Sequence, residues 1–306
     1  MEYDFYTTDV FTDQKFGGNP LAVFPHAAGL SDHQMQQIAR EFNLSETIFI
    51  VDSDLTATKP IFKVRIFTPN HELPFAGHPT VGGAFVLATI GIIQPTGPIT
   101  EIVFDELIGP VPIKVFSDES GTVTGAQLSA AVMPHVVPGA PSADELAPLF
   151  GLQPGDVLSN AFSPEIVTAG TPRLFVPVKH RTALGQITLD LAQWRKQLPN
   201  MRSAYAFCTD PEQKGSDLRG RMFVVPPNGS GMYEDPATGS AVTGLAAYLT
   251  ERSSLKNGTL RWVMEQGFEM GRPSILEMEA DVVDGECQAI RIAGSAVLVS
   301  KGTFFM

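Results

Sequence analysis

Two stretches of the chain, ELPFAGHPTVGGAFVL at residues 72–87 and EDPATGSAVTGLAAYL at residues 234–249, determine how the sequence is organised. Shifting the first by 162 positions onto the second makes six of sixteen residues identical, where average composition gives about one. Upstream, RIF at residues 65–67 resembles RMF at residues 221–223, with an insertion before the second stretch. A strand, a turn with Glu and Pro, a glycine and a helix thus occur twice, which predicts two homologous domains.

Each stretch predicts a helix, over residues 79–92 and 240–250, that is apolar nearly all round and contains small residues. A helix of this kind has no solvent face, so both helices should be buried. Short segments with apolar residues at alternate positions predict strands around them. These segments are 46–51, 62–66, 101–104, 111–116, 173–178, 221–225, 259–264, 274–278 and 296–305.

We therefore predict an α+β fold with two pseudo-symmetric domains, each a curved, mostly antiparallel sheet around a buried central helix. The expected domains are residues 1–120 and 121–295, with the last strand, 296–306, returning to the first. A break rich in Ser, Gly and acidic residues separates them.

Three further helices are expected on the surface. Residues 31–42 have an amphipathic pattern, with a Ser31/Gln34 capping box at the start and Asn43 placed to end the helix. Residues 143–150 and 187–198 are the other two candidates.

Composition limits the classes of function. The chain has 306 residues, of which 43% are hydrophobic and 18% charged, as expected for a globular protein large enough for two domains. The net charge of −12 makes nucleic acid and anionic membranes poor partners. The longest apolar run, near residues 81–93, is shorter than the roughly 20 residues that span a bilayer.

The N-terminal residues lack the basic and apolar regions of a signal peptide. Cys208 and Cys287 are far apart in the sequence and form neither a disulfide framework nor a metal-binding pair. A cytoplasmic location is therefore expected.

The starts of the two buried helices are candidate binding sites, because the first turn of a helix presents unpaired N–H groups and a partial positive charge. Gly77 and Gly239 allow the backbone to approach a ligand closely, and Pro79 suits the first position of its helix. If the two domains face each other, both helix starts point into one cleft. We expect Gly77, Thr238 and Gly239 to bind substrate there, most simply through a carboxylate.

The polar residues around these starts have structural as well as chemical interpretations. Thr238 and Ser240 could be ordinary N-caps, Asp235 could stabilise the turn, and His78 could be a buried histidine between domains. Glu46 could be a solvated loop carboxylate. It also leads a strand in which Ile48 and Ile50 lie on the same face, a setting that can raise the pKa of a general acid.

Several familiar catalytic motifs are missing. The sequence contains no Walker A loop, no strand-linked GxGxxG and no GxSxG elbow. NGSG at residues 228–231 is glycine-rich but precedes a turn, which makes it a weak phosphate site. Ser240, His78 and Asp235 could formally compose a hydrolytic triad.

Several motifs together resemble the phenazine-biosynthesis PhzF-like family across nearly the whole chain and in the same order. They are DVF at 9–11, GNP at 18–20, NLSET at 43–47, FTP at 67–69, ELPFAGHPT at 72–80, EDPATGSA at 234–241 and GRP at 271–273. The resemblance implies the diaminopimelate epimerase fold, with two pseudo-symmetric α+β domains and the active site between them.

The resemblance also implies site roles. It gives Glu46 the role of the proton-carrying acid and base, and His78, Asp235 and Ser240 assisting roles in binding and proton transfer. Asn19, in the GNP motif, is expected to bind substrate. Epimerases and racemases of this fold use two cysteines at the helix starts. This chain has His78 and Ser240 near those starts, which argues against stereoinversion by a thiol pair. The resemblance favours a homodimer.

Three functions follow as hypotheses. The first is a cofactor-independent isomerase that uses Glu46 to move a proton within a small carboxylate-bearing metabolite, without metal or organic cofactor. The second is a small-molecule-binding or regulatory protein without turnover. The third is a hydrolase that uses Ser240 as nucleophile.

Overall fold

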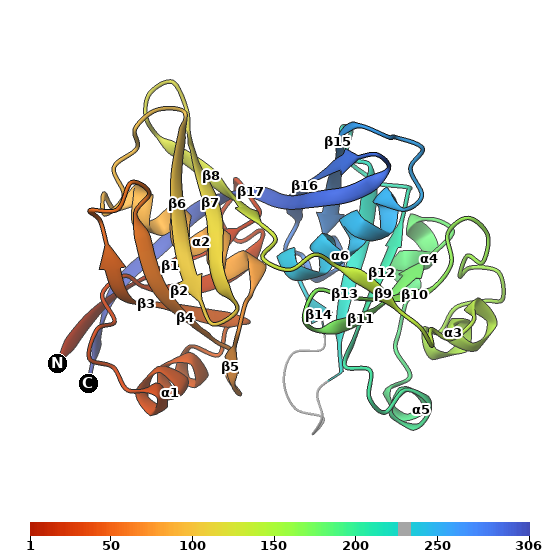
Figure 1. Ribbon diagram of the computed structural model, residues 1–306. Coiled ribbons are helices and arrows are strands. Elements are labelled where there is room, and N and C mark those ends of the chain that lie inside the picture. The colour runs from red at the N-terminus through yellow and green to blue at the C-terminus, as the bar shows by residue number, and fades with distance from the viewer. Residues whose placement is uncertain (226–233) are drawn as a thin grey trace. The chain divides into compact units, whose positions relative to one another are not determined.

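The computed structural model of the chain describes residues 1–225 and 234–306 (Figure 1). Within this part the chain forms two compact units, Met1–Ala131 with Arg291–Met306, and Val132–Ile290. We call them unit 1 and unit 2. The NGSG segment at residues 228–231 lies outside the described residues.

Unit 1 is a sheet of strands around one central helix, with a second helix on its surface. Its β2–β3 and β4–β6 pairs are parallel, and its other strand pairs are antiparallel. The elements are β1 (Glu2–Val10), β2 (Asn19–Phe24), α1 (Asp32–Phe42), β3 (Glu46–Asp54), β4 (Ile61–Phe67), β5 (Glu72–Leu73), α2 (Gly77–Thr89), β6 (Ile99–Glu106), β7 (Gly109–Ser117), β8 (Val123–Ser129) and the later part of β17 (Glu286–Phe305).

Unit 2 is also a sheet with one central helix, and it has further helices packed on the sheet. Its elements are β9 (His135–Val137), α3 (Ala143–Leu149), β10 (Glu165–Thr168), β11 (Pro172–Pro177), α4 (Arg181–Gln186), α5 (Leu191–Gln197), β12 (Ser203–Cys208), β13 (Leu218–Val224), β14 (Glu234–Asp235), α6 (Gly239–Thr250), β15 (Gly258–Gln266), the 3₁₀ turn η1 (Phe268–Met270) and β16 (Ser274–Val283).

The strand pairings follow the same order in both units. In unit 1, β2 pairs parallel with β3, β3 antiparallel with β4, β4 antiparallel with β5 and parallel with β6, and β6 antiparallel with β7. In unit 2 the same sequence of orientations joins β11, β12, β13, β14, β15 and β16. The central helix follows the fourth of these strands in each unit.

Both central helices are buried as the sequence predicts. Every residue of α2 from Gly77 to Ala88 is buried, and so is every residue of α6 except Ser240. Each helix lies against the strands of its own unit (Figure 1). Both helices approach their sheets closely at a glycine. A Cβ at Gly82 would lie 2.5 Å from Val10 Cγ2, and one at Gly244 would lie 2.8 Å from Phe175 Cζ.

The units do not begin and end at the positions expected from the sequence. Unit 1 extends beyond residue 120 to Ala131, because β8 pairs antiparallel with both β7 and β17. It resumes at Arg291, five residues before the expected 296, for the same reason. The Ser- and Gly-rich break is the turn between β7 and β8.

Helix α1 has the predicted capping box at Ser31 and Gln34 and ends at Asn43, which is left-handed. The prediction of a single helix over residues 187–198 is wrong. Ile187 ends α4, and Asp190 caps α5 by accepting from the N–H groups of Ala192 and Gln193. Between them, Thr188 N–H and Asp190 N–H donate to carbonyls at the end of α3 instead of continuing a helix.

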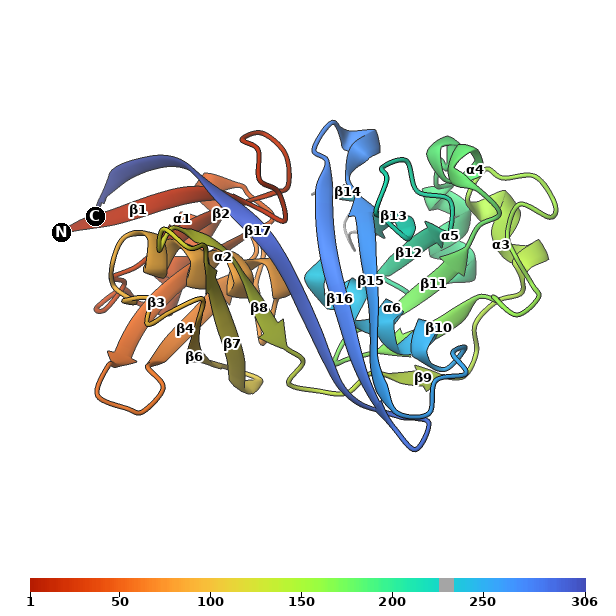
Figure 2. The same cartoon turned by 90° about the horizontal axis from the view of Figure 1, so that it is seen from above.

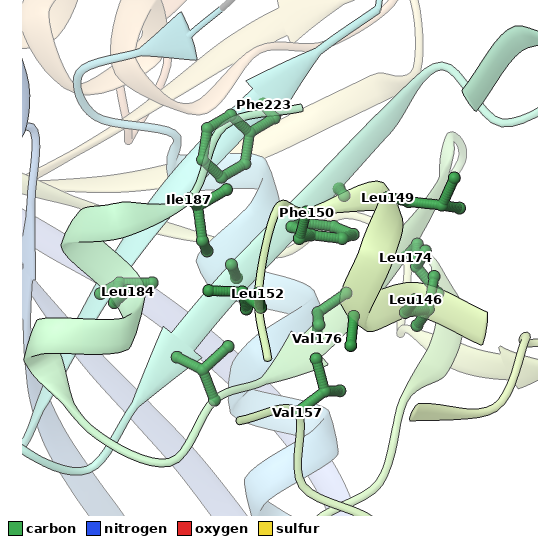
Figure 3. Packing of buried hydrophobic residues seen from close by; sticks show 14 of the residues in the cluster. Leu146, Leu149, Phe150, Leu152, Val157, Leu174, Val176, Leu184, Ile187 and Phe223 are labelled. Carbon is green, nitrogen blue, oxygen red and sulfur yellow. The ribbon is translucent and has the colours of Figure 1, made fainter. Parts of the chain in front are cut away.

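The side chains of α3 and α4 form a second core on the sheet of unit 2. Figure 3 shows this cluster, which includes Leu146 and Phe150 from the α3 region, Leu184 and Ile187 from the α4 region and Val176 of β11. This burial explains why the segment breaks at Ile187, which is 4% exposed. No helix among the described residues is long and apolar enough to cross a membrane.

Candidate active site

Glu46 is the first residue of β3, directly after the short loop that follows α1. The left-handed Asn43 ends the helix and turns the chain, and Leu21 of β2 pairs with Glu46 in a parallel register. Its side chain is 18% exposed. The acidic group therefore lies near the surface while Ile48 and Ile50, on the same face, are buried.

Glu46 contacts His78 of the central helix directly. Glu46 Oε2 lies 3.1 Å from His78 Nδ1, and Asn19 Nδ2 lies 3.3 Å from the same nitrogen. Ser45 Oγ donates to Asn19 Oδ1 at 3.0 Å. Three residues that the sequence analysis selected from distant motifs, Asn19, Glu46 and His78, thus form one cluster in unit 1.

The histidine in this cluster is neutral near pH 7. Its side chain is 4% exposed, and burial lowers the pKa of His78 to about 3. A neutral imidazole holds one hydrogen, so Nδ1 either donates to an ionised Glu46 or accepts from a protonated one. The contact is thus suited to holding a proton on either side of a short hydrogen bond.

His78 is placed by the first turn of α2. Gly77 is the first residue of the helix, and Ala76 is the N-cap, with no side-chain hydrogen bond to it. Pro79, expected at the first position, is in fact the third. Its ring is tolerated there because the first four N–H groups of a helix have no partner within it.

The second cluster is at the start of α6 in unit 2. Asp235 ends β14, Thr238 is the N-cap of α6, and the Thr238 hydroxyl donates to the Asp235 carboxylate. Gln266 fixes this turn: its Nε2 donates to the Asp235 carbonyl at 2.7 Å and to Thr238 Oγ1 at 3.1 Å. Tyr205 hydroxyl donates in turn to Gln266 Oε1 at 2.9 Å.

Ser240 is the second residue of α6, next to Gly239, and it contacts a cation. Arg173 Nη2, on β11, donates to Ser240 Oγ at 2.9 Å. Because a guanidinium can only donate, Ser240 Oγ must accept there, and its own hydrogen is left to be donated elsewhere. A nucleophilic serine donates that hydrogen to a base, and Arg173, which only donates, cannot be that base.

An equivalent ion pair precedes each central helix. Arg65 of β4 donates to both carboxylate oxygens of Glu72, and Arg221 of β13 donates to both of Glu234, at 2.8 and 2.9 Å. Such bidentate ion pairs fix the relative orientation of the two side chains and also stabilise the fold. In each unit the pair joins the strand to the turn that leads into the helix.

The structure therefore groups the predicted residues by unit. Asn19, Glu46, Gly77 and His78 lie together in unit 1, and Asp235, Thr238, Gly239 and Ser240 lie together in unit 2. Sequence reasoning missed Arg173 and Gln266. Arg173 opens a predicted strand and Gln266 follows another, so their positions were visible but their partners were not.

Among residues 1–225 and 234–306, no group of three or more His, Cys, Asp and Glu side chains is arranged to hold a metal ion.

Comparisons with known proteins match the chain over its whole length. The profile of the phenazine biosynthesis-like protein family, PhzC-PhzF, matches residues 8–302. An uncharacterized isomerase of Mesorhizobium japonicum is 37% identical over 97% of each chain. The trans-2,3-dihydro-3-hydroxyanthranilate isomerase of Pseudomonas fluorescens is 29% identical over 99% of this chain and 100% of its own.

Solved structures show the same fold. A phenazine biosynthesis protein of the PhzF family from Bacillus anthracis superposes with a TM-score of 0.85 at 25% identity, covering 100% of both chains. A probable proline racemase from Agrobacterium radiobacter gives a TM-score of 0.63 at 14% identity, covering 98% of this chain and 92% of its own. The second likeness concerns the fold alone.

Proposed function

Because the chain belongs to the phenazine biosynthesis-like protein family and is an isomerase of that family, we propose that it moves a proton within a small carboxylate-bearing metabolite, with Glu46 as the acid and base. The observation that carries the proposal is the 3.1 Å contact between Glu46 and the buried, neutral His78.

The chemistry follows from the movement of charge. Glu46 takes a proton from one carbon of the substrate, becomes an acid, and returns the proton to a second carbon, so that bonds and charges balance without an external oxidant or reductant. His78 supports both states of Glu46, because its Nδ1 donates to the carboxylate and accepts from the acid. Asn19 Nδ2 contacts the same nitrogen at 3.3 Å and donates to it in the tautomer in which Nδ1 accepts.

The cluster in unit 2 supplies hydrogen-bond donors. The Ser240 hydroxyl, oriented by Arg173, and the first N–H groups of α6 after Thr238 and Gly239 are donors suited to a carboxylate or to negative charge that develops during the reaction. Gly77 offers the same at the start of α2. Asp235 holds Thr238 in position. The proposal requires that both clusters act on one substrate.

The substrate class is argued from the donors and from the relatives. The donor groups favour an anionic ligand, and the named Pseudomonas isomerase acts on trans-2,3-dihydro-3-hydroxyanthranilate. We take that conjugated amino acid as the first compound to test. No step in this scheme calls on a metal or an organic cofactor.

The two units would then derive from duplication of one ancestral domain. Three features support a pseudo-symmetric origin. The shift of 162 positions that aligns the two sequence stretches also aligns the helix starts Gly77 and Gly239, the strand pairs follow a matching order, and each unit has an equivalent Arg–Glu pair. A homodimer and a cytoplasmic location are further parts of the proposal. Light scattering of the purified protein tests the first, and fractionation of the host cell tests the second.

Replacing Glu46 by Gln tests the mechanism. We expect Glu46→Gln to reduce turnover of trans-2,3-dihydro-3-hydroxyanthranilate by about 10²- to 10⁴-fold while ligand affinity changes little, because the shape is kept and the titrating proton is lost. The matched control is Glu41→Gln on the exposed face of α1, which should be fully active.

The readout is product analysis together with deuterium uptake at carbon in D₂O. Turnover by Glu46→Gln at the parental rate would remove Glu46 from the mechanism. If the parent binds this compound and related acids without forming product, the protein is a binding protein and the proposed activity is wrong.

A further inference from the structure

Glu106 is a carboxyl group inside the core of unit 1 that the proposed reaction does not use. It is the last residue of β6 and is 5% exposed. It lies on the same face of the strand as Phe104 and Ile102, both fully buried, whereas the intervening Asp105 is exposed. A carboxyl group in such a row must be explained, because an ionised group is costly to bury.

The hydrogen bonds around Glu106 require an extra proton. Thr80 Oγ1 lies 2.6 Å from Glu106 Oε1 and 2.8 Å from the carbonyl oxygen of Ala76. A threonine hydroxyl has one hydrogen, and a backbone carbonyl can only accept. If Glu106 is protonated, it donates to Thr80 Oγ1, Thr80 donates to Ala76, and each contact has its own hydrogen. If Glu106 is ionised, one contact has none.

Two further observations agree with a protonated side chain. Burial raises the pKa of Glu106 to about 8. Its second oxygen, Oε2, has no hydrogen-bond partner among the described residues. An unpaired oxygen costs less on a neutral acid than on a carboxylate.

Within residues 1–225 and 234–306, no nearby cation compensates a charge at this position. The titratable residues on the elements packed around Glu106 are His78 on α2, Lys63 and Arg65 on β4, Glu72 on β5 and Lys114 on β7. His78 is neutral, and Arg65 is paired with Glu72. Lys63 and Lys114 alternate with buried residues and therefore point to the other face of the sheet.

Unit 2 has a permanently neutral group at the equivalent position. Phe67 pairs with Glu72 as Phe223 pairs with Glu234, which aligns β4 with β13. In this alignment the residue next in register after the Lys63–Asp105 pair is Glu106, and its counterpart, paired with Gly220, is Gln266.

Gln266 is fully buried and donates to Thr238 Oγ1 at the start of α6. If Glu106 is protonated, the equivalent side chains of both units are thus neutral donors to a threonine hydroxyl. The threonine is the N-cap Thr238 in unit 2 and Thr80, the fourth residue of α2, in unit 1.

Glu106 and its neighbours hold the start of α2. Ala76, the N-cap, has no side-chain hydrogen bond, so this helix lacks the usual cap. Instead, the Thr80 hydroxyl bonds the Ala76 carbonyl, and Ile108 N–H, two residues after Glu106, donates to the Pro74 carbonyl at 3.0 Å. In the sequence, His78 lies between Ala76 and Thr80, which this hydroxyl joins.

We propose that Glu106 is a positioning residue, kept protonated in the folded protein, whose proton fixes the first turn of α2 and thereby His78. Loss of this proton at high pH leaves one hydrogen for the two contacts of Thr80 Oγ1, with Glu106 and with the Ala76 carbonyl, and loosens the first turn of α2. The consequence for catalysis rests on the proposed function, whereas the protonation state does not.

Protonation is tested by infrared spectroscopy of the whole protein. We expect the carbonyl stretch of one protonated carboxylic acid at pH 7, lost reversibly above pH 8 and missing from Glu106→Gln at all pH values. Glu101→Gln, on an exposed position of the same strand, is the control and should keep the band. A parent spectrum without this band at pH 7 overturns the proposal, whether or not the variant folds.

Stability gives the second readout. A carboxyl group whose pKa rises on folding contributes stability that is complete at low pH and is lost between its ordinary value of 4.5 and about 8. We expect the unfolding constant of the parent, relative to that of Glu106→Gln, to rise by up to tenfold per pH unit in this window. Parallel pH profiles for the two proteins would overturn the proposal.

Activity separates this inference from the proposed function. With Glu106 protonated as described, the parent should lose isomerase activity reversibly above pH 8 through kcat, and Glu106→Gln should retain it. If the infrared and stability results hold but the parent has no isomerase activity, the proposed function fails and the protonation of Glu106 stands. If activity in both proteins falls identically, Glu106 does not position His78.

Discussion

At the scale of single residues, the clusters show how burial selects the charge state of polar groups. His78 and Glu106 are both almost completely buried in unit 1, and burial moves the pKa of each towards the neutral form, to about 3 and about 8. Each then acts through hydrogen bonds, with Glu46 and Asn19 for one and with Thr80 for the other. An ionised Glu106 would need a compensating cation, which the described side chains in contact with it do not supply.

The buried histidine predicts sensitivity to acid. A histidine whose pKa falls on folding contributes stability that is complete above its ordinary value of 6.5 and is lost as the pH falls towards 3. We expect the parent to lose up to about 1.4 kcal/mol per pH unit in this window relative to His78→Asn. Urea denaturation at a series of pH values measures it.

The control for this experiment is His33→Asn, at an exposed position of α1, which should follow the parent at every pH. If His78→Asn loses stability on acidification in parallel with the parent, the neutral state of His78 does not contribute to folding.

At the scale of elements, the sequence predicted local features well and long-range partners poorly. The capping box of α1, the left-handed Asn43 and the burial of α2 and α6 depend on neighbouring residues, and all were confirmed. The helix over residues 187–198 failed because residues 188 and 190 bond to the end of α3, which no local pattern reveals.

The same distinction holds for the site. Asn19, Glu46 and His78 were chosen from motifs. The hydrogen bonds of Arg173 to Ser240 and of Gln266 to Thr238 instead join strands β11 and β15 to the start of α6, 67 and 28 positions away in the sequence. Single-sequence periodicity carries no information on which strands become neighbours.

The helix glycines make a prediction about packing. A Cβ at Gly82 would lie 2.5 Å from Val10 Cγ2 and 2.6 Å from Leu21 Cδ2, and one at Gly244 would lie 2.8 Å from Phe175 Cζ. We expect Gly82→Ala and Gly244→Ala each to destabilise the protein by about 1–3 kcal/mol, although alanine is the better helix former.

Gly185, in α4, supplies the matched control because a Cβ there has nothing within 4 Å. Gly185→Ala should be neutral or stabilising by up to about 1 kcal/mol. Denaturant titration of the three variants measures the difference. Equal stability of Gly82→Ala and Gly185→Ala would mean that α2 can shift away from β1 and β2 at little cost.

At the scale of the whole chain, unit 1 is built from both ends of the sequence. β1 pairs antiparallel with β17 from Glu2–Phe305 to Val10–Ala296, and β8 pairs with an earlier part of β17. The chain ends meet, since the Met1 amino group donates to the Met306 carbonyl and Met306 N–H donates to the Met1 carbonyl at 2.8 Å. Figures 1 and 2 show β17 lying along β1 with the two ends together.

This arrangement predicts opposite results for two changes at the C-terminus. Deleting residues 296–306 removes the part of β17 that pairs with β1 and leaves β1 paired with β2 alone. We expect this deletion to prevent unit 1 from folding, because it exposes one edge of β1 and the face of Phe24 that Phe304 contacts.

Joining Met306 to Met1 by a short glycine linker keeps every strand pair. With new ends opened in the exposed turn at residues 118–122, between β7 and β8, we expect this permuted chain to unfold at nearly the parental denaturant concentration. Far-ultraviolet circular dichroism during denaturation measures both proteins. A stable truncated chain with the parental spectrum would show that β17 is dispensable for unit 1, and an unfolded permuted chain would show that the β7–β8 turn must remain closed for folding.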